Sequence, residues 1–356
     1  QVTHARVQNL DSIWAGQHFA TGPVKMFQPL PILSRIASES GDMQIGTAVS
    51  LLSMQNPARV AEEIATLDWI TGGRVIFGAG IGYRDEEFIV TGHDKHTRAK
   101  RFSEAIKLVR HWWTDEIVNF KGDYFSIPGI QPSLSSYQKG GPKIWIAGEV
   151  EASVKRAALI GDAWIPLPIP NNQELKEKLS YYQSEREKSG LPATTEQPLM
   201  REVYISDDDE QAYQEVSPHL MKKYKTYASW GQEESSESMQ SIENNFKEFC
   251  SNRFLIGGID TITKEILNYE KNYGVSHLIC RIHWPGMKQD QVLKTISMLG
   301  KCSAQINSPK YSNEFLNIGV GARSLAMSNS VITSTNSAMS GFWNPANLSK
   351  INNDIQ

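Results

Sequence analysis

The sequence lacks the features that mark several common classes of protein. Only three of its 356 residues are cysteines, Cys250, Cys280 and Cys302, and their spacing matches no metal-binding or redox motif. Such usage is typical of reduced thiols in a cytosolic protein and argues against a disulfide framework. No apolar run approaches the length of a membrane-spanning helix, and no signal peptide is recognisable. We therefore expect a cytoplasmic protein.

An excess of one charge is also missing. Lys and Arg number 36 against 39 Asp and Glu, which gives a net charge of −3. This balance gives no reason to expect nucleic acid or an anionic membrane as a partner. The G-x-S-x-G elbow, the P-loop and the H-E-x-x-H motif are absent as well. His93 and His96 lie in a polar loop without a third ligand nearby, so we expect solvated side chains and no metal.

The sequence does contain a repeated alternation of strand and helix patterns, which predicts a parallel sheet with helical crossovers. The expected strands are seven, at residues 11–16, 43–49, 74–80, 140–148, 162–167, 199–206 and 274–284. A closed (β/α)8 barrel needs eight. Residues 1–9 look like the end of a helix, so we expect an α/β barrel that lacks its first strand. Alternation alone leaves an open, doubly wound sheet as the alternative.

The segment from Thr71 to Gly92 bears on this choice. A short apolar run is followed by Gly78, Gly80 and Gly82, which is typical of a buried strand that enters a glycine-rich loop. A dinucleotide-binding turn would need G-x-G-x-x-G and an acidic residue about 20 positions later. Here the third glycine is misplaced, and no strand ends in Asp or Glu at the right distance. The segment therefore favours the barrel.

Several motifs along residues 10–300 carry a resemblance to one family. They are LDSIWAGQHF, GTAVSLLSMQNPARVAEEIATLDWITGGRVIFGAGIGYRDEEFIVTG, RAKRFSEAIKLVRHWW, PKIWIAGEVEASVKRAALIGDAWI and GVSHLICRIHWPGM. In this order they resemble the bacterial luciferase-like monooxygenase superfamily. The resemblance implies a (β/α)8 TIM barrel and a flavin-dependent oxidoreductase, above all a monooxygenase that uses reduced FMN and dioxygen on a small organic substrate. It also implies a flavin reductase as a possible partner and a homodimer.

Two other functions stay open. One is a deazaflavin-dependent hydride-transfer enzyme on the same fold, because the glycine loop and phosphate site would look alike. The other is a non-catalytic flavin-binding barrel or an inactive fragment, because a missing strand would leave two unpaired edges.

The resemblance also implies site residues. His18 matches a histidine beside the flavin ring, where an imidazole can exchange protons near neutral pH. The family often has Glu before this histidine, whereas this sequence has Gln17. Ala48 and Val49 match the place of a non-prolyl cis peptide under the ring. Gly80 and Gly82 would contribute backbone beside the flavin.

A phosphate site is expected where a strand ends and a helix begins, because free backbone N–H groups and the helix dipole favour an anion there. The residues that match it are Gly148, Glu149, Val150 and Ser153. Ser153 could instead be a plain helix cap. Arg98, or else Arg101, matches an arginine that pairs with the same phosphate.

Other polar and aromatic residues have weaker assignments. Trp14, Trp145, Trp164 and Trp284 fall in or just after strands; they could wall the cavity, although core packing is the better prediction for at least two of them. Arg281 needs a partner in the last strand, either a substrate anion or a neighbouring carboxylate. The acidic residues 85–87 are expected to be the solvated start of a helix.

The composition changes near Pro309 to Ser, Asn and Gly with little charge. We expect a barrel domain at residues 1–305 and an unrelated tail at 306–356, a fusion fragment without a function. Through FLNIGVGARSLAM and WNPANL the tail resembles the start of an outer-membrane β-barrel protein of the fatty-acid transporter type. The alternative is a genuine appended segment.

Overall fold

Parallel strands form the centre of the structure, a computed structural model that describes residues 1–22, 24–230 and 245–307. The first ladder runs in the order β1 (Ser12–Ala15), β2 (Gln44–Thr47), β4 (Val75–Gly80), β7 (Lys143–Ala147) and β8 (Ala163–Ile165). The short strand β3 (Ser50–Leu51) also pairs with β4. Because neighbours in the ladder follow one another along the chain, each pair is joined by a crossover, as the alternation predicts.

A second parallel ladder completes the sheet around β9 (Pro198–Ile205), which pairs with β10 (Leu255–Gly257) and with β11 (His277–Arg281). Strands β8 and β9 are neighbours. Within the described residues no ladder joins β11 to β1; the two strands approach through the rings of Trp14 and His277, whose centroids lie 6.2 Å apart. The absence of a first strand stays a prediction.

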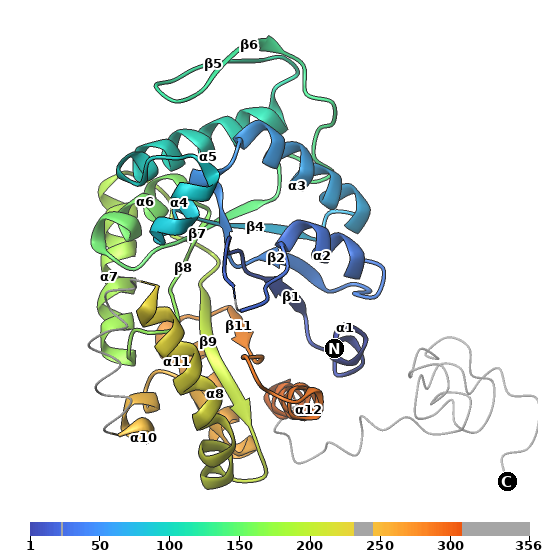
Figure 1. The fold of residues 1–356 in the computed structure, drawn as a ribbon, viewed down its shortest axis with the longest axis vertical. Helices are drawn as coiled ribbons and strands as arrows, with labels where there is room; N and C mark the ends of the chain where they lie inside the picture. Colours follow the sequence, from blue (N-terminus) through green and yellow to red (C-terminus); the bar gives the residue numbers. More distant parts are fainter. Residues whose placement is uncertain (23, 231–244, 308–356) are drawn as a thin grey trace, which may run out of the picture. The chain divides into compact units, whose positions relative to one another are not determined.

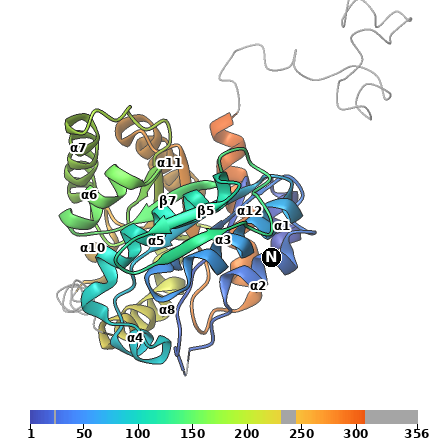
Figure 2. The same ribbon diagram turned by 90° about the horizontal axis from the view of Figure 1, so that it is seen from above.

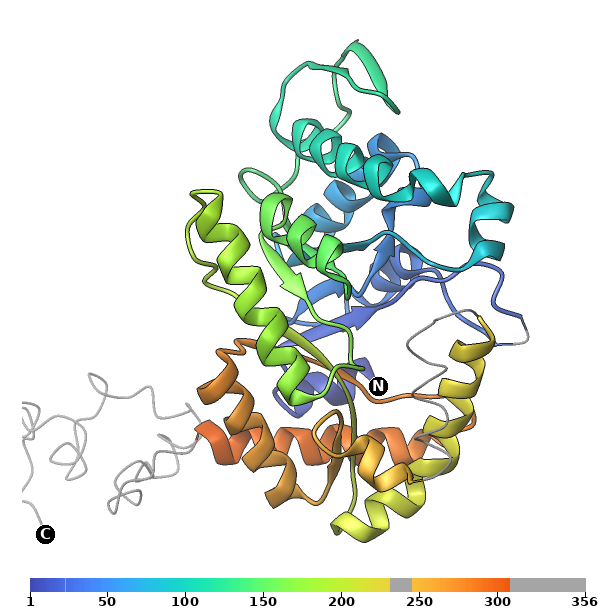
Figure 3. The same ribbon diagram turned by 90° about the vertical axis from the view of Figure 1, so that its left-hand side faces the viewer.

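Helices cover the outside of the strands (Figures 1 and 2). They are α1 (Val2–Val7), α2 (Pro29–Ile36), α3 (Pro57–Thr71), α4 (Asp85–Thr91), α5 (Arg98–Thr114), α6 (Glu151–Ile160), α7 (Asn172–Lys188), α8 (Asp209–Ser229), α10 (Phe246–Cys250), α11 (Ile259–Tyr273) and α12 (Gln289–Asn307). Helices α6 and α7 lie side by side, and Figure 3 shows α12 in orange-red across the end of the second ladder. No helix of the described ranges has both the length and the apolar character needed to cross a membrane.

Local signals explain where several helices begin and end. Asn56 caps α3, because its side chain accepts hydrogen bonds from the N–H groups of Ala58 and Arg59, and Pro57 occupies the first helical position. The same helix ends at Gly72 with a φ of 65°, a conformation that favours glycine. Both ends of α3 thus follow from local signals in the sequence.

Two elements are missing from the sequence-based expectations. The polar segment after α5 forms an antiparallel hairpin of β5 (Val118–Lys121) and β6 (Ser126–Ile130). The hairpin projects beyond α5 in Figure 1. Its turn depends on Glu104, whose carboxylate accepts the N–H groups of Asp123, Tyr124 and Phe125. Strand β10 was also not predicted. It is three residues long and has no alternating pattern of its own.

The main core lies between the first ladder and helices α3, α5 and α6. Phe77, Phe102 and Trp164 are fully buried there, and each such side chain contributes about 1.5–3 kcal/mol through removal from water. Trp145 is fully buried inside the barrel, and Trp284 is 2% exposed. Core packing of at least two of the tryptophans is therefore confirmed.

Candidate functional site

A cavity of 1140 Å³ lies at the carboxyl ends of β1, β4 and β7 and extends into the barrel. The predicted site residues come from five separate stretches of the chain. All of them line this one cavity: His18, Ala48, Val49, Gly80, Gly82, Arg98, Gly148, Glu149, Val150 and Ser153. Parallel strands bring these segments together because their carboxyl ends meet at one edge.

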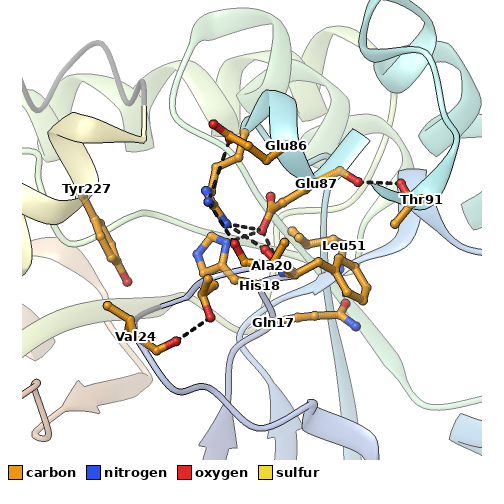
Figure 4. Close-up of polar contacts among 12 residues, drawn as sticks. Gln17, His18, Ala20, Val24, Leu51, Glu86, Glu87, Thr91 and Tyr227 are labelled. Carbon is orange, nitrogen blue, oxygen red and sulfur yellow. Dashed lines mark hydrogen bonds and ion pairs between the residues drawn. The ribbon is translucent and has the colours of Figure 1, made fainter. Parts of the chain in front are cut away.

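His18 follows β1 and is held by a carboxylate. Its Nδ1 lies 2.7 Å from Oε1 of Glu87 on α4, and the same oxygen accepts the N–H of Phe19 at 3.0 Å. Glu87 is fully buried, and Figure 4 shows the imidazole between Glu87 and Tyr227. With the carboxylate accepting a hydrogen bond from the Nδ1–H group, Nε2 is the nitrogen left for proton exchange.

The role of Glu87 corrects one sequence-based expectation. Asp85 and Glu86 are exposed in the first turn of α4, as predicted, but Glu87 turns inward. Arg84 beside it is 3% exposed; its Nη1 lies 3.6 Å from Oε1 of Glu87 and donates to the carbonyl of Phe19 at 2.8 Å. The acidic cluster therefore divides into a solvated part and a buried carboxylate that orients His18.

Gln17 does not take that orienting role. Its side-chain oxygen accepts the N–H of Leu51 at 2.8 Å and a bond from Gln55 at 3.1 Å. It thereby connects the end of β1 to β3. The carboxylate that contacts His18 belongs to Glu87, whose spacing of 69 residues from His18 leaves no local signal in the sequence.

Glycine permits a close approach of backbone on the β4 side of the cavity. A Cβ on Gly80 would lie 2.8 Å from Cγ2 of Val49, and one on Gly82 would lie 2.1 Å from Cε of Met54. Gly82 also has a φ of 70°. The bond between Ala48 and Val49 is a cis peptide, at the position expected from the resemblance.

The loop before α6 has the form of an anion site. A Cβ on Gly148 would lie 2.4 Å from Oγ of Ser153. Ser153 does not cap the helix, which begins after Val150; its hydroxyl donates to the carbonyl of Val150 at 2.6 Å. The carboxylate of Glu149 pairs with Lys178, which also donates to the Glu149 carbonyl at 2.9 Å. Glu149 can therefore contribute to the cavity through its backbone.

Arg98 is the better of the two arginine candidates. Its Nη1 donates to the carbonyl of Lys95 at 2.9 Å, whereas its buried Nε has no hydrogen-bond partner among the described residues. Arg101 instead donates to the carbonyl of Ser53 at 2.9 Å. Arg156 on α6 is a residue that the sequence did not single out: burial first, and then the charge of Arg98, lower the pKa of its guanidinium. Two neighbouring guanidinium groups suit an anion.

Comparison with known proteins gives a consistent result. The family model for luciferase-like monooxygenases matches residues 2–276. The chain is 26% identical over 309 residues to the F420-dependent glucose-6-phosphate dehydrogenase of Amycolatopsis mediterranei, a match that covers 81% of this chain and 88% of that protein. It is 25% identical over 224 residues to the oxygenase component of the flavin-dependent trigonelline monooxygenase of Acinetobacter baylyi, with 62% of each chain covered.

Solved structures show the same fold. The monooxygenase RslO1 from Streptomyces bottropensis superposes with a TM-score of 0.74 at 19% identity, over 86% of this chain and 93% of that one. An F420-dependent secondary alcohol dehydrogenase with an F420–acetone adduct gives a TM-score of 0.72 at 20% identity, with the same coverage. The oxygenating constituent of 3,6-diketocamphane monooxygenase from Pseudomonas putida, in complex with FMN, gives 0.69 at 18% identity over 85% of this chain and 90% of that one. These likenesses place the chain among luciferase-like TIM barrels.

Proposed function

Because the chain belongs to the luciferase-like monooxygenase family, whose compared members are flavin- or F420-dependent oxidoreductases, we propose that it is a monooxygenase. It would use reduced FMN and dioxygen to oxidise a small organic substrate. The observation that carries the proposal is the His18–Glu87 pair at 2.7 Å on the same cavity as the anion site before α6. An imidazole that can exchange protons and a site for the cofactor phosphate thus line the same cavity.

The residues present fit such a cofactor. Gly80 lets β4 pack closely against Val49, since a Cβ at Gly80 would lie 2.8 Å from the Val49 side chain, and the backbone of Gly80, Ala48 and Val49 lines the cavity where a flat ring would lie. The Nε of Arg98, which has no hydrogen-bond partner within the described ranges of the chain, and the start of α6 suit a phosphate. These groups would hold the cofactor, which supplies the electron transfer to dioxygen when bound.

The protein itself would contribute orientation, exclusion of water and proton exchange. Glu87 fixes the ring of His18 so that Nε2 faces the reacting groups. Trp14, Met200 and Ile279 line the cavity with apolar surface, which keeps water out and strengthens electrostatic interactions inside. A reductase would supply the reduced cofactor, in keeping with the relative that is an oxygenase component. We further propose a homodimer.

Titration with oxidised FMN and, separately, with F420 tests the proposal. We expect FMN to bind and to support oxygen consumption when it is supplied in reduced form with a substrate. Failure to bind either cofactor would show that the proposal is wrong. Binding without substrate-dependent oxygen consumption would favour a non-catalytic barrel.

A second candidate is hydride transfer to or from F420, which the relative matched over 81% of this chain favours. The two candidates differ in their need for oxygen. Reduction of F420 by a substrate under anaerobic conditions would establish the second candidate, whereas oxygen consumption with reduced FMN would establish the first.

A further inference from the structure

A buried charged cluster adjoins the cavity on the side of β9 and β11. It consists of Glu202 on β9, Lys223 on α8 and Arg281 at the end of β11. Glu202 is fully buried and Lys223 is 4% exposed. The side chain of Arg281 is 30% exposed, and Arg281 lines the cavity. Of the three charges, that of Arg281 is therefore the one presented to a ligand.

Glu202 is satisfied without Arg281. Its Oε1 accepts hydrogen bonds from Nζ of Lys223 and, at 3.3 Å, from Oη of Tyr224. Its Oε2 accepts the indole N–H of Trp284 at 2.6 Å. Nη1 of Arg281 stands 3.4 Å from Oε1, which is longer than the roughly 2.7–2.9 Å of a charge-assisted hydrogen bond. Lys223 therefore makes the closer contact with Glu202, and Arg281 faces the same carboxylate from a greater distance.

While Lys223 is protonated, the cluster consequently holds two cations against one carboxylate. Within the part of the chain that the structure describes, Glu202 is the only carboxylate paired with Arg281. A positive charge that is removed from water without a full counter-ion is unfavourable. The environment of Lys223 reflects this surplus: burial, and then the charge of Arg281, lower its pKa to about 7. An anion beside Arg281 would restore the balance.

Hydroxyl groups surround the same part of the cavity. Nη2 of Arg281 donates to Oη of Tyr227 at 2.9 Å. The ring of Tyr227 lies 6.2 Å from that of His18, and Figure 4 shows Tyr227 across from the imidazole. The ring of Tyr83 lies 5.9 Å from that of His18, and its buried hydroxyl has no hydrogen-bond partner among the described residues. A ligand atom here would reach both the imidazole and the guanidinium.

We propose that Arg281, with the hydroxyls of Tyr227 and Tyr83, binds a carboxylate group of the substrate beside His18. The inference rests on the proposed function, because it assigns one group of the molecule that the enzyme would oxidise. A monoanion matches the one surplus charge that the cluster carries while Lys223 is protonated, whereas a phosphate dianion would leave an uncompensated negative charge. The planar guanidinium also matches the geometry of a carboxylate.

Binding of benzoate, with benzamide and phenyl phosphate as comparison probes, tests the proposal. Intrinsic tryptophan fluorescence reports binding without any cofactor, since Trp284 contacts the cluster through Glu202. We expect benzoate to bind at least about tenfold more tightly than benzamide, in line with a hydrogen bond to a charged group. Tighter binding of phenyl phosphate than of benzoate, lost in Arg281→Met, would overturn the assignment to a monoanion.

Variants test whether the preference for benzoate depends on Arg281 and Tyr227 or on the overall charge of the protein. Arg281→Met should remove the preference for benzoate over benzamide, and Tyr227→Phe should reduce it about two- to tenfold through one lost hydrogen bond. The control is Arg110→Met, since Arg110 pairs with Asp162 at 3.0 Å and both side chains are exposed; it should keep the full preference. If Arg281→Met does not fold, Tyr227→Phe and Arg281→Lys decide the question.

Two further results have distinct meanings. An unchanged preference in both Arg281→Met and Tyr227→Phe would overturn the inference, as would equal binding of benzoate and benzamide. A clear preference for benzoate in a protein that binds neither FMN nor F420 would support the carboxylate site at Arg281 and overturn only the proposed function.

Discussion

The two sides of the cavity differ in the groups that they offer a ligand. The side formed after β4 and β7 offers backbone at Gly80 and Gly148, where a side chain would collide with Val49 or Ser153. The side formed by β9 and β11 offers a charged side chain, Arg281, supported by a buried cluster. Backbone groups suit a cofactor that is the same in every cycle, whereas side chains can be exchanged to suit a substrate. The difference suggests that the side after β4 and β7 binds the cofactor and that the side of β9 and β11 selects the substrate.

Removal of the His18 side chain should have the largest effect on turnover, because the imidazole lies between the cofactor side and the substrate side. We expect His18→Ala to lower turnover by about 10²–10⁴-fold, the range of general acid–base catalysis, while FMN affinity stays unchanged. Oxygen consumption and an FMN titration measure the two quantities. His111→Ala, at an exposed position of α5, is the matched control. Turnover that survives in His18→Ala would remove the catalytic role.

Glu87→Gln should have the next largest effect, because the amide cannot hold His18 as the carboxylate does. Loss of a charged hydrogen bond of roughly 1.5–3 kcal/mol would lower turnover about 10–100-fold. Oxygen consumption with reduced FMN measures this loss. Glu86→Gln, at an exposed neighbouring position, should keep full turnover. Unchanged turnover in Glu87→Gln would limit Glu87 to a structural role.

The same pair shows how far the sequence predicts the site. Gly80, Gly148 and Ser153 lie in short motifs that combine a strand end with a turn, so they can be found without a structure. Glu87 cannot, because its partner His18 is 69 residues away and its neighbour Glu86 has the same chemistry but faces solvent. Burial, which separates the two, depends on how α4 packs.

The fold follows a similar rule. The parallel strands and the long helices were predictable, because apolar periodicity and caps such as Asn56 are local. The hairpin β5–β6 was not, because Glu104 holds its turn from another element. The sequence left the partner of Arg281 open between a substrate anion and a neighbouring carboxylate. The structure provides the carboxylate, Glu202, and the charge of the cluster leads us to propose the substrate anion as well. The outer-membrane resemblance falls on residues 308–356, outside the described residues.

Arg98→Met should weaken the cofactor side alone. We expect FMN to bind about tenfold more weakly, as for a lost hydrogen bond of about 1.5 kcal/mol to a charged group. Benzoate binding should not change, because Arg98 belongs to the opposite side. Arg101→Met is the informative companion: it loses a bond to the Ser53 carbonyl, so it should lower the melting temperature and leave FMN affinity unchanged. The reverse pattern would assign the phosphate to Arg101.

The smallest expected effect is a change in the pH dependence of the free energy of unfolding, caused by Lys223→Met on the substrate side of the cavity. The pKa of Lys223 is about 7 in the folded protein, below its usual 10.5. Between these values the unfolded chain binds more protons than the folded one, so the free energy of unfolding should rise with pH, by roughly 1 kcal/mol from pH 7 to pH 8. Below pH 7 lysine is protonated in both states, and this contribution no longer changes.

Urea unfolding at pH 7 and pH 8 measures that rise, and comparison with variants assigns it. Titrating groups away from the cluster are unchanged in both variants, so their contributions cancel in the difference. Lys223→Met should lack the lysine contribution, whereas Lys222→Met, at the exposed neighbouring position, should keep it. Equal pH dependence in both variants would mean that Lys223 stays charged throughout. The two cations would then coexist beside Glu202 at neutral pH, and the demand of the cluster for an anion would be greater still.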